Sequence, residues 1–166
     1  MRGALSHELV SAQFRRSAGP QLLARERQAG MAIGNHSYNH PEVPPFAKLP
    51  RRLLEDEIAL GAESLVRLGI RPRLLRPPGG SVSPAVVQAA EARGERVVLW
   101  SVDPADWRPG VTARQIARRV LGAVRPGSIV LLHDGGGDRS ATVAALPAIV
   151  KGIRRRGLRL VEIAAR

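Results

Sequence analysis

Residues 97–107 read Val-Val-Leu-Trp-Ser-Val-Asp-Pro-Ala-Asp-Trp, and this segment gives the clearest indication of the fold. The unbroken apolar run at 97–102 predicts a strand that is buried on both faces, as in a parallel sheet. Polar residues follow it at once. The same order recurs at 129–134, where Ile-Val-Leu-Leu precedes His-Asp. Ligands of parallel α/β proteins bind at the carboxyl ends of strands, so both polar clusters are candidate site residues.

Helical patterns separate the predicted strands. Apolar residues recur at helical spacing within 50–68, 112–124 and 140–156, and Ser83-Pro84 is typical of the start of a helix that ends near Ala92. Thr112 and Gln115 predict a capping box. Three further short strands are predicted, at 31–35, 74–76 and 158–163. The sequence thus predicts an α/β fold with a mostly parallel sheet and right-handed crossovers.

Length and composition narrow the class of protein. The chain has 166 residues, of which 44% are hydrophobic and 24% charged, and this describes one globular domain that needs no disulfide or metal for its core. It has no cysteine, which excludes thiolate metal sites and cysteine nucleophiles. We expect no membrane span, and the first thirty residues lack the apolar core of a signal peptide. Localisation is left open.

The formal net charge of +12 suggests nucleic-acid binding at first sight. However, 24 of the 26 basic residues are Arg, which indicates compositional bias, and the chain has five aromatic residues with which to stack bases. We therefore predict no nucleic-acid partner.

Two histidines lie four residues apart in the segment His36-Ser-Tyr-Asn-His40. This spacing predicts that both imidazoles lie on one side of a helical turn, where they could share a metal ion. The alternative is a pair of ordinary surface histidines, which this spacing alone does not exclude.

His133 ends a buried strand, and this position suits a general acid or base. The alternative is a core histidine that bonds to a carbonyl. For the neighbouring Asp134 and Asp138 we favour structural roles, with Asp138 capping the next helix.

Asp103 and Asp106 precede Trp107 at the end of another strand. A carboxylate bonded to an imidazole fixes its tautomer and favours the imidazolium. Trp107 is either a groove wall for a sugar or a core residue. Arg76, before two prolines, is either a cation that orients a carboxylate or one more surface arginine.

Four motifs, taken in order, carry a family resemblance: H-S-Y-N-H, R-P-P-G-G, D-P-A-D-W and L-L-H-D. They resemble motifs two to five of the polysaccharide deacetylases, carbohydrate esterase family 4, over residues 20–163. The resemblance implies an incomplete distorted (β/α) barrel. It also implies hydrolytic removal of acetyl groups from N-acetylated or O-acetylated sugars, in peptidoglycan or a chitin-like polymer, with a divalent metal that is most often zinc.

The resemblance implies a role for each matching residue. His36 and His40 would bind the metal, with Ser37 supporting their turn. His133 would protonate the leaving amine, and Asp106 would tune the acidity of His133. Arg76 would orient the catalytic base. The residues expected to contact the substrate are Trp107, Leu131 and Gly79, the last through its backbone. These groups are expected to converge on one cleft.

The family's first motif, Thr-Phe-Asp-Asp-Gly, has no counterpart here. It supplies the general base and the third metal ligand, whereas every Asp of this chain lies at or after position 56. Five predicted strands are also few for such a barrel. We therefore expect a chain that begins inside the domain, with residues 1–19 as leftover or poorly ordered sequence and 20–166 as a partial deacetylase domain. Weaker metal binding and impaired catalysis would follow, and the alternative is a non-catalytic carbohydrate-binding remnant.

Overall fold

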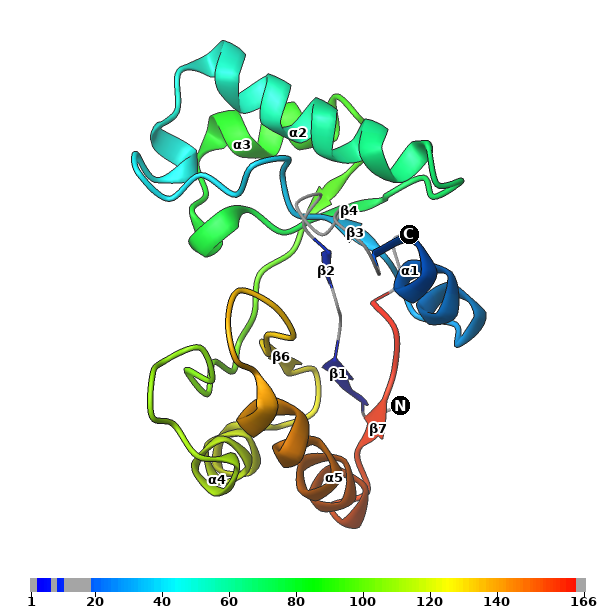
Figure 1. Ribbon diagram of the computed structural model, residues 1–166, viewed down its shortest axis with the longest axis vertical. Helices are drawn as coiled ribbons and strands as arrows, with labels where there is room; N and C mark the ends of the chain where they lie inside the picture. The colour runs from blue at the N-terminus through cyan, green and yellow to red at the C-terminus, as the bar shows by residue number, and fades with distance from the viewer. Residues whose placement is uncertain (1–2, 7–8, 11–18, 164–166) are drawn as a thin grey trace. The chain divides into compact units, whose positions relative to one another are not determined.

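The computed structural model describes residues 3–6, 9–10 and 19–163 (Figure 1). These residues form two compact units. One contains strand β1 and residues 100–163, and the other contains strand β2 and residues 19–99. Within the described residues, no helix is both long enough and apolar enough to cross a membrane.

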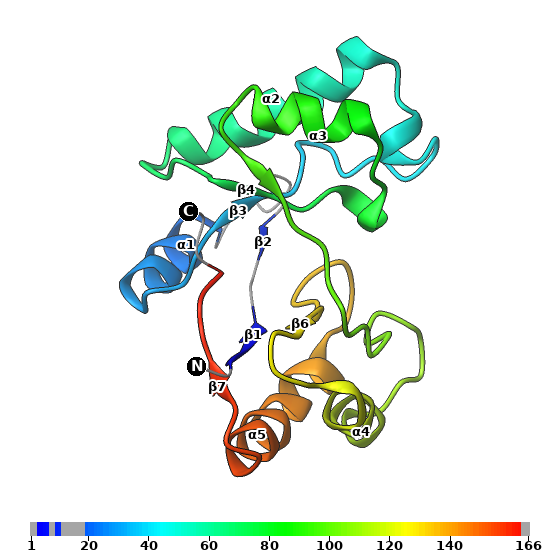
Figure 2. The same cartoon turned by 180° about the vertical axis from the view of Figure 1, so that it is seen from behind.

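The unit of residues 19–99 is a parallel sheet with helices packed on it. Its strands pair in sequence order: β2 (Leu9–Val10), β3 (Gly34–Asn35), β4 (Leu74–Leu75) and β5 (Arg96–Val97). Figure 2 shows helices α2 (Arg51–Val66) and α3 (Pro84–Glu91) together on one side of this sheet. The core between them consists of fully or nearly buried residues: Phe46, Leu54, Ile58, Leu75, Val86, Ala89 and Ala90. Helix α1 (Gly19–Gln28) adds Leu23 to a smaller cluster, and two short 3₁₀ helices cover Phe46–Lys48 and Pro78–Gly80.

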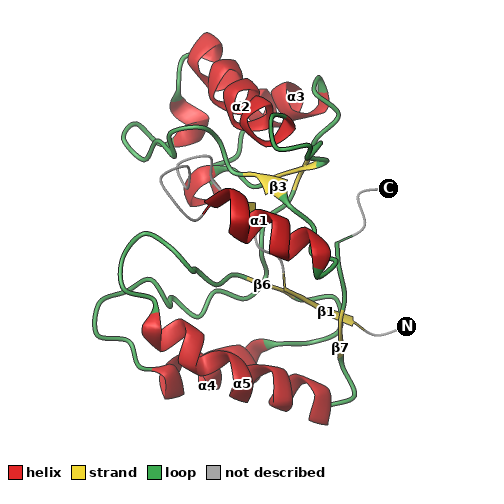
Figure 3. Ribbon diagram, turned by 45° about the vertical axis from the view of Figure 1, so that its right-hand side comes forward, coloured by secondary structure: helices red, strands yellow, loops and turns green. Residues whose placement is uncertain are grey.

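The unit of residues 100–163 is built around a second parallel sheet. Strand β1 (Gly3–Ser6) lies between β6 (Ile129–Val130) and β7 (Arg159–Leu160). Helices α4 (Ala113–Ala123) and α5 (Ser140–Arg155) pack side by side, as Figure 3 shows. Their apolar stripes meet the sheet in a core of buried residues: Val102, Ile116, Val120, Val130, Ala145, Ile149 and Ile153.

The predicted fold class and helices are confirmed. The strand pairs are parallel, and four of the helices occupy the predicted segments. The Ser83 hydroxyl accepts the N–H of Val86, and Thr112 and Gln115 form the predicted reciprocal capping box. These caps explain why α3 and α4 begin where they do, since each satisfies a backbone donor that has no partner inside the helix.

The observed strands differ from the prediction in two respects. The segment 97–102 is not one strand buried on both faces: β5 ends at Val97, Val102 forms a single bridge to Val130, and Leu99 between them is 39% exposed. An apolar run shows no alternation, so it could not indicate where regular pairing stops. Strands β1 and β2 were not predicted, and both fall within 1–19; the other residues before 19 lie outside the described ranges.

Candidate functional site

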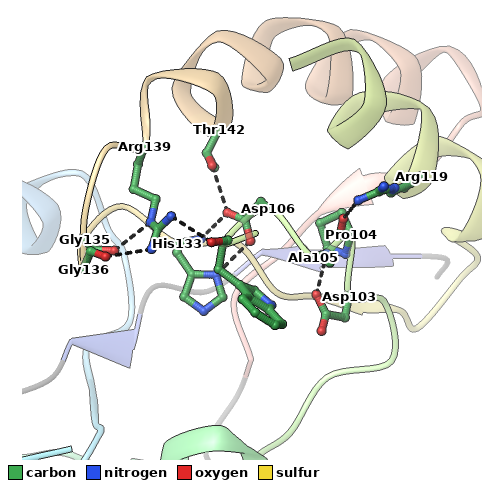
Figure 4. Close-up of polar contacts among 11 residues, drawn as sticks. Asp103, Pro104, Ala105, Asp106, Arg119, His133, Gly135, Gly136, Arg139 and Thr142 are labelled. Carbon is green, nitrogen blue, oxygen red and sulfur yellow. Dashed lines mark hydrogen bonds and ion pairs between the residues drawn. The ribbon is translucent and has the colours of Figure 1, made fainter. Parts of the chain in front are cut away.

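His133 and Asp106 are joined by direct hydrogen bonds in the unit of residues 100–163 (Figure 4). The His133 Nδ1 atom lies 2.8 Å from Asp106 Oδ1, and the His133 backbone N–H donates to Asp106 Oδ2, also at 2.8 Å. The Thr142 hydroxyl on α5 donates to the same Oδ2 at 2.9 Å. The Asp106 side chain is fully buried, whereas 35% of the His133 side chain is exposed. One edge of the imidazole is therefore anchored while the ring remains accessible from solvent.

The surroundings of Asp106 keep its carboxylate ionised. Burial raises the pKa of Asp106, but the hydrogen bonds and charge of His133, together with the Thr142 hydroxyl, more than offset this, so the pKa lies below its ordinary value. An ionised carboxylate only accepts hydrogen bonds, and the proton of this contact therefore belongs to His133 Nδ1. The tautomer places proton exchange with a substrate at Nε2.

Arg139 links the loop after His133 to the D-P-A-D-W motif (Figure 4). Its guanidinium donates to the carbonyl oxygens of Gly135 at 2.8 Å, Gly136 at 2.9 Å and Trp107 at 3.4 Å. Asp138 accepts the N–H of Ser140, the first residue of α5, at 2.9 Å, but the N-cap position itself is Arg139, so the predicted cap is displaced by one residue. The Arg139 contacts hold the backbone that follows His133 and the backbone that follows Asp106.

Trp107 and Leu131 differ in their exposure. Trp107 is 45% exposed, and the guanidinium carbon of Arg108 lies 5.3 Å from its ring centre. This exposure rules out the core alternative for Trp107 and suits a surface that contacts a ligand. Leu131 is buried, and its N–H donates to Val102. That both residues contact an acetylated sugar stays a prediction.

The histidine loop lies in the unit of residues 19–99, and its conformation corrects one expectation. Residues 36–40 do not form a helical turn, because Ser37 and His40 have positive φ angles of 65° and 54°. The two imidazoles still approach each other, with ring centres 4.8 Å apart at 73°. The buried Ser37 hydroxyl accepts the His40 N–H at 3.0 Å and so supports the turn, as the family resemblance implies.

The two imidazoles fit a divalent metal as a pair of donors. His36 Nδ1 lies 2.5 Å from the carbonyl oxygen of Arg76, which can only accept, so Nδ1 carries the proton and Nε2 the lone pair. A backbone partner of this kind is typical of metal-binding histidines. Within the described ranges, no group of three or more His, Cys, Asp or Glu side chains is arranged to hold a metal. The described residues therefore offer two imidazole donors here, whereas a zinc site commonly uses three protein ligands.

Arg76 is a buried residue. It is 3% exposed, which rules out the surface alternative, and burial lowers its pKa to about 10, so the guanidinium stays charged at neutral pH. Its backbone contacts the start of the histidine loop twice: its carbonyl oxygen lies at His36 Nδ1, and its N–H donates to the carbonyl oxygen of Asn35. Gly79 follows in a tight turn with a φ of 58°, a conformation that favours glycine. The roles of Arg76 toward a base and of Gly79 toward an oxyanion stay predictions.

Asn35 and Glu95 form a buried polar pair below the histidine loop. Asn35 Nδ2 donates to Glu95 Oε2 at 3.0 Å and to the carbonyl of Ile58 at 2.9 Å, while its Oδ1 accepts the Ser37 N–H at 3.1 Å. Burial raises the pKa of Glu95 to about 7, although the Asn35 hydrogen bond and the charge of Arg93 oppose the rise. This network connects a buried carboxyl group to the start of the loop.

The predicted site residues thus fall into two sets, one in each unit. His133, Asp106, Trp107 and Leu131 belong to one, and His36, His40, Arg76 and Gly79 to the other. The structure assembles the contacts within each set, and the convergence of the two sets on one cleft stays a prediction.

Sequence reasoning did not identify the supporting residues. For Thr142 a signal existed: it occupies the apolar stripe of α5 with Ala145, Ile149 and Ile153, where a hydroxyl needs a buried partner. Arg139 and Glu95 gave no comparable signal, since both lie in segments rich in charged residues.

Comparison with known proteins identifies the family. The family model described as polysaccharide deacetylase matches residues 6–98. The chain belongs to the polysaccharide deacetylase family.

Relatives within this family support the assignment along most of the chain. A peptidoglycan-N-acetylglucosamine deacetylase of Bacillus cereus is 39% identical over 153 residues, which cover 90% of this chain and 70% of that protein. A second deacetylase of the same name and organism is 36% identical and covers 87% of this chain, but the chain spans only 52% of its length. A chitooligosaccharide deacetylase of Bradyrhizobium is 36% identical, over 85% of this chain and 68% of that protein.

Solved structures of polysaccharide deacetylase relatives share the fold. A family 4 carbohydrate esterase from Streptomyces lividans, in complex with acetate, matches with a TM-score of 0.84 and 26% identity, over 98% of this chain and 80% of that chain. A peptidoglycan deacetylase from Bacillus subtilis matches with a TM-score of 0.81 and 27% identity, over 96% of this chain and 74% of that chain.

Proposed function

We propose that this polysaccharide deacetylase family member hydrolyses the acetamide of an N-acetylated sugar within a polymer such as peptidoglycan or a chitin-like chain. The reaction consumes one water and releases acetate and a free amine. The observation that carries the proposal is the hydrogen bond between the accessible imidazole of His133 and the buried, ionised carboxylate of Asp106. The names of the relatives, which are deacetylases of peptidoglycan and of chitooligosaccharides, support the substrate class.

His133 would act as the acid that protonates the departing amine nitrogen. Breaking a carbon–nitrogen bond expels a strongly basic amine, and protonation removes that cost. Asp106 holds the imidazole by Nδ1, so Nε2 is the atom that gives the proton. The negative charge of Asp106 also favours the imidazolium form that an acid requires. Trp107 would contact the sugar beside this group, through the face that remains exposed.

His36 and His40 would hold a divalent metal, and their imidazole donors favour zinc. When bound, zinc supplies Lewis acidity to an acetyl carbonyl oxygen and makes water more acidic. His36 would bind through Nε2, because the Arg76 carbonyl oxygen holds the proton at Nδ1. With two ligands from the described residues, we expect weaker zinc binding than at a site with three protein ligands.

The experiment that tests this function measures acetate released from acetylated chito-oligosaccharides. The purified chain is assayed with added zinc, after chelator treatment, and as the His36→Ala variant to detect contaminating hydrolase. Zinc-dependent acetate release that the chelator and His36→Ala both abolish supports the proposal. The same release from all three samples, or from none, would contradict it.

A second candidate function is carbohydrate binding without turnover. One observation favours it: among the residues that the structure describes, no group of three or more His, Cys, Asp or Glu side chains is arranged to hold a metal. Exposed Trp107 could still contact a sugar ring. Binding of the oligosaccharide in calorimetry, with no acetate release at any zinc concentration, would favour this candidate over the enzyme.

A further inference from the structure

The segment between His36 and His40 adopts a costly backbone conformation. Ser37 and His40 have φ angles of 65° and 54°, in the left-handed region that non-glycine residues avoid. Such positions cost of order 1–3 kcal/mol each and persist only where surrounding contacts hold them. The spacing of the two imidazoles therefore depends on the contacts that hold this loop in its conformation.

Glu57 on helix α2 accepts hydrogen bonds from the middle of the loop. Its Oε2 accepts the backbone N–H groups of Tyr38 at 3.0 Å and of Asn39 at 2.8 Å, and its Oε1 accepts Asn39 Nδ2 at 2.6 Å. Tyr38 and Asn39 lie directly between the two histidines. One carboxylate thus takes three donors from the residues between the predicted ligands, and bonds to a charged acceptor are about twice as strong as neutral ones.

Residues of α2 next to Glu57 and one turn further on contact the start of the loop. The carbonyl of Ile58, next to Glu57, accepts from Asn35 Nδ2 at 2.9 Å. At Gly61, one turn further on, a Cβ atom would collide with Asn35 Oδ1 and lie 2.9 Å from the Ser37 carbonyl carbon. Helix α2 therefore contacts the loop closely at three successive points, and Glu57 is the charged one.

We propose that Glu57 is a positioning residue that holds His36 and His40 at the spacing of a metal-binding pair. The proposal rests on the proposed function for the identity of the metal, but not for the geometry of the loop. Glu57 acts through the backbone of Tyr38 and Asn39, so its effect should reach the imidazoles without any contact between the carboxylate and a ligand.

The experiment compares Glu57→Gln with Glu63→Gln in the full chain. Glu63 is an exposed glutamate on the same helix, so its variant controls for the loss of one negative charge from α2. Glutamine keeps the size of Glu57 but replaces one acceptor oxygen with a donor nitrogen. The readouts are zinc affinity by calorimetry, the NMR signals of the His36 and His40 imidazoles, and amide hydrogen exchange at Tyr38 and Asn39.

In Glu57→Gln we expect zinc affinity to fall by about 10- to 100-fold, the range for lost supporting contacts around a metal site. The two imidazole signals should shift and the two amides should exchange faster, while the His133 signal stays in place. Glu63→Gln should match the wild type in all three. Imidazole signals and exchange rates in Glu57→Gln that equal those of Glu63→Gln would overturn the proposal.

Two further results separate this proposal from the proposed function. If the wild-type chain binds no zinc, the metal part of the proposed function fails, and the imidazole and amide readouts still decide the role of Glu57. If Glu57→Gln does not fold, Asn39→Ala replaces it, because this variant removes the Nδ2 contact with Glu57 and keeps the backbone N–H groups of Tyr38 and Asn39 that donate to Glu57. Asn39→Ala should change the imidazole signals in the same direction by a smaller amount, and unchanged signals would overturn the proposal.

Discussion

His133 donates its Nδ1 proton to Asp106 across 2.8 Å, and Asp106 accepts two further hydrogen bonds, from the His133 backbone and from Thr142. A buried carboxylate with three donors is rigid as well as charged. It fixes which imidazole nitrogen is available to a substrate. Relatives in this family are named as deacetylases, and the function proposed above assigns to this contact the acid of the reaction.

Replacing Asp106 with asparagine should impair acetate release while leaving the fold intact. The amide removes the negative charge that favours the imidazolium, and it no longer holds the proton on Nδ1. We expect a rate loss of about 10²- to 10⁴-fold, the usual contribution of general acid–base catalysis. The control is Asp103→Asn in the same motif, where the side-chain oxygen can still accept the Ala105 N–H. Equal rates for the two variants would show that Asp106 does not tune the acid.

Thr142→Val should lower stability in a pH-dependent way. Valine keeps the shape but removes one of the two donors to Asp106 Oδ2, and losing a hydrogen bond to a charged group costs about 1.5–3 kcal/mol. The lowered pKa of Asp106 stabilises the fold above its unfolded-state pKa, and this contribution is lost as the pH falls through the folded-state pKa. Urea unfolding should therefore show a larger difference from wild type at pH 7 than at pH 3. A difference that is constant with pH would contradict the assignment.

Glu95→Gln should remove a pH dependence of opposite sign. Burial raises the Glu95 pKa from 4.5 to about 7, so between these values the folded chain binds more protons than the unfolded one. Wild-type stability should then fall as the pH rises through this window, by as much as about 3 kcal/mol, and level off above it. The free energy of unfolding should be measured for both proteins from pH 4.5 to 8. As the pH rises, the value for the glutamine variant should increase relative to that of the wild type. Parallel curves for the two proteins would refute this.

Gly61→Ala should destabilise the chain by about 1–3 kcal/mol, since the added methyl group overpacks α2 against Asn35 and Ser37. Gly122→Ala is the matched control: Gly122 lies in the last turn of α4, and a Cβ there meets no atom within 4 Å. That variant should be stabilised by about 0.5–1 kcal/mol through reduced backbone entropy. Thermal unfolding of both variants checks the prediction, and equal shifts would show that α2 has room at Gly61.

The helices were predictable because their signals are local. Helix α4 carries its own capping box and apolar stripe, and α3 begins at the serine and proline that indicate it. Each predicted strand overlaps an observed strand but was drawn too long, and strands β1 and β2 were not predicted. Pairing depends on a neighbouring strand, and a continuous apolar run carries no information about where that neighbour ends.

The sequence pointed to His133 and Asp106, which the structure brings into contact, but not to the residues that support them. Both follow apolar runs, and polar residues in such positions can indicate chemistry. The left-handed turn at Ser37 and His40 depends on Glu57 and Gly61, which lie about twenty residues further along the chain, so local spacing suggested a helical turn instead. The R-P-P-G-G motif singled out Arg76 among 24 arginines, and its burial excludes the surface alternative that the sequence left open.

The most direct test of the proposed function is the rate at which His133→Gln releases acetate from an acetylated chito-oligosaccharide, with zinc present, relative to the wild-type chain. Glutamine preserves a polar side chain of similar length but cannot deliver a proton to the departing amine. We expect the rate to fall by about 10²- to 10⁴-fold with the thermal midpoint little changed. A His133→Gln variant that releases acetate at the wild-type rate would contradict the assignment of His133 as the acid.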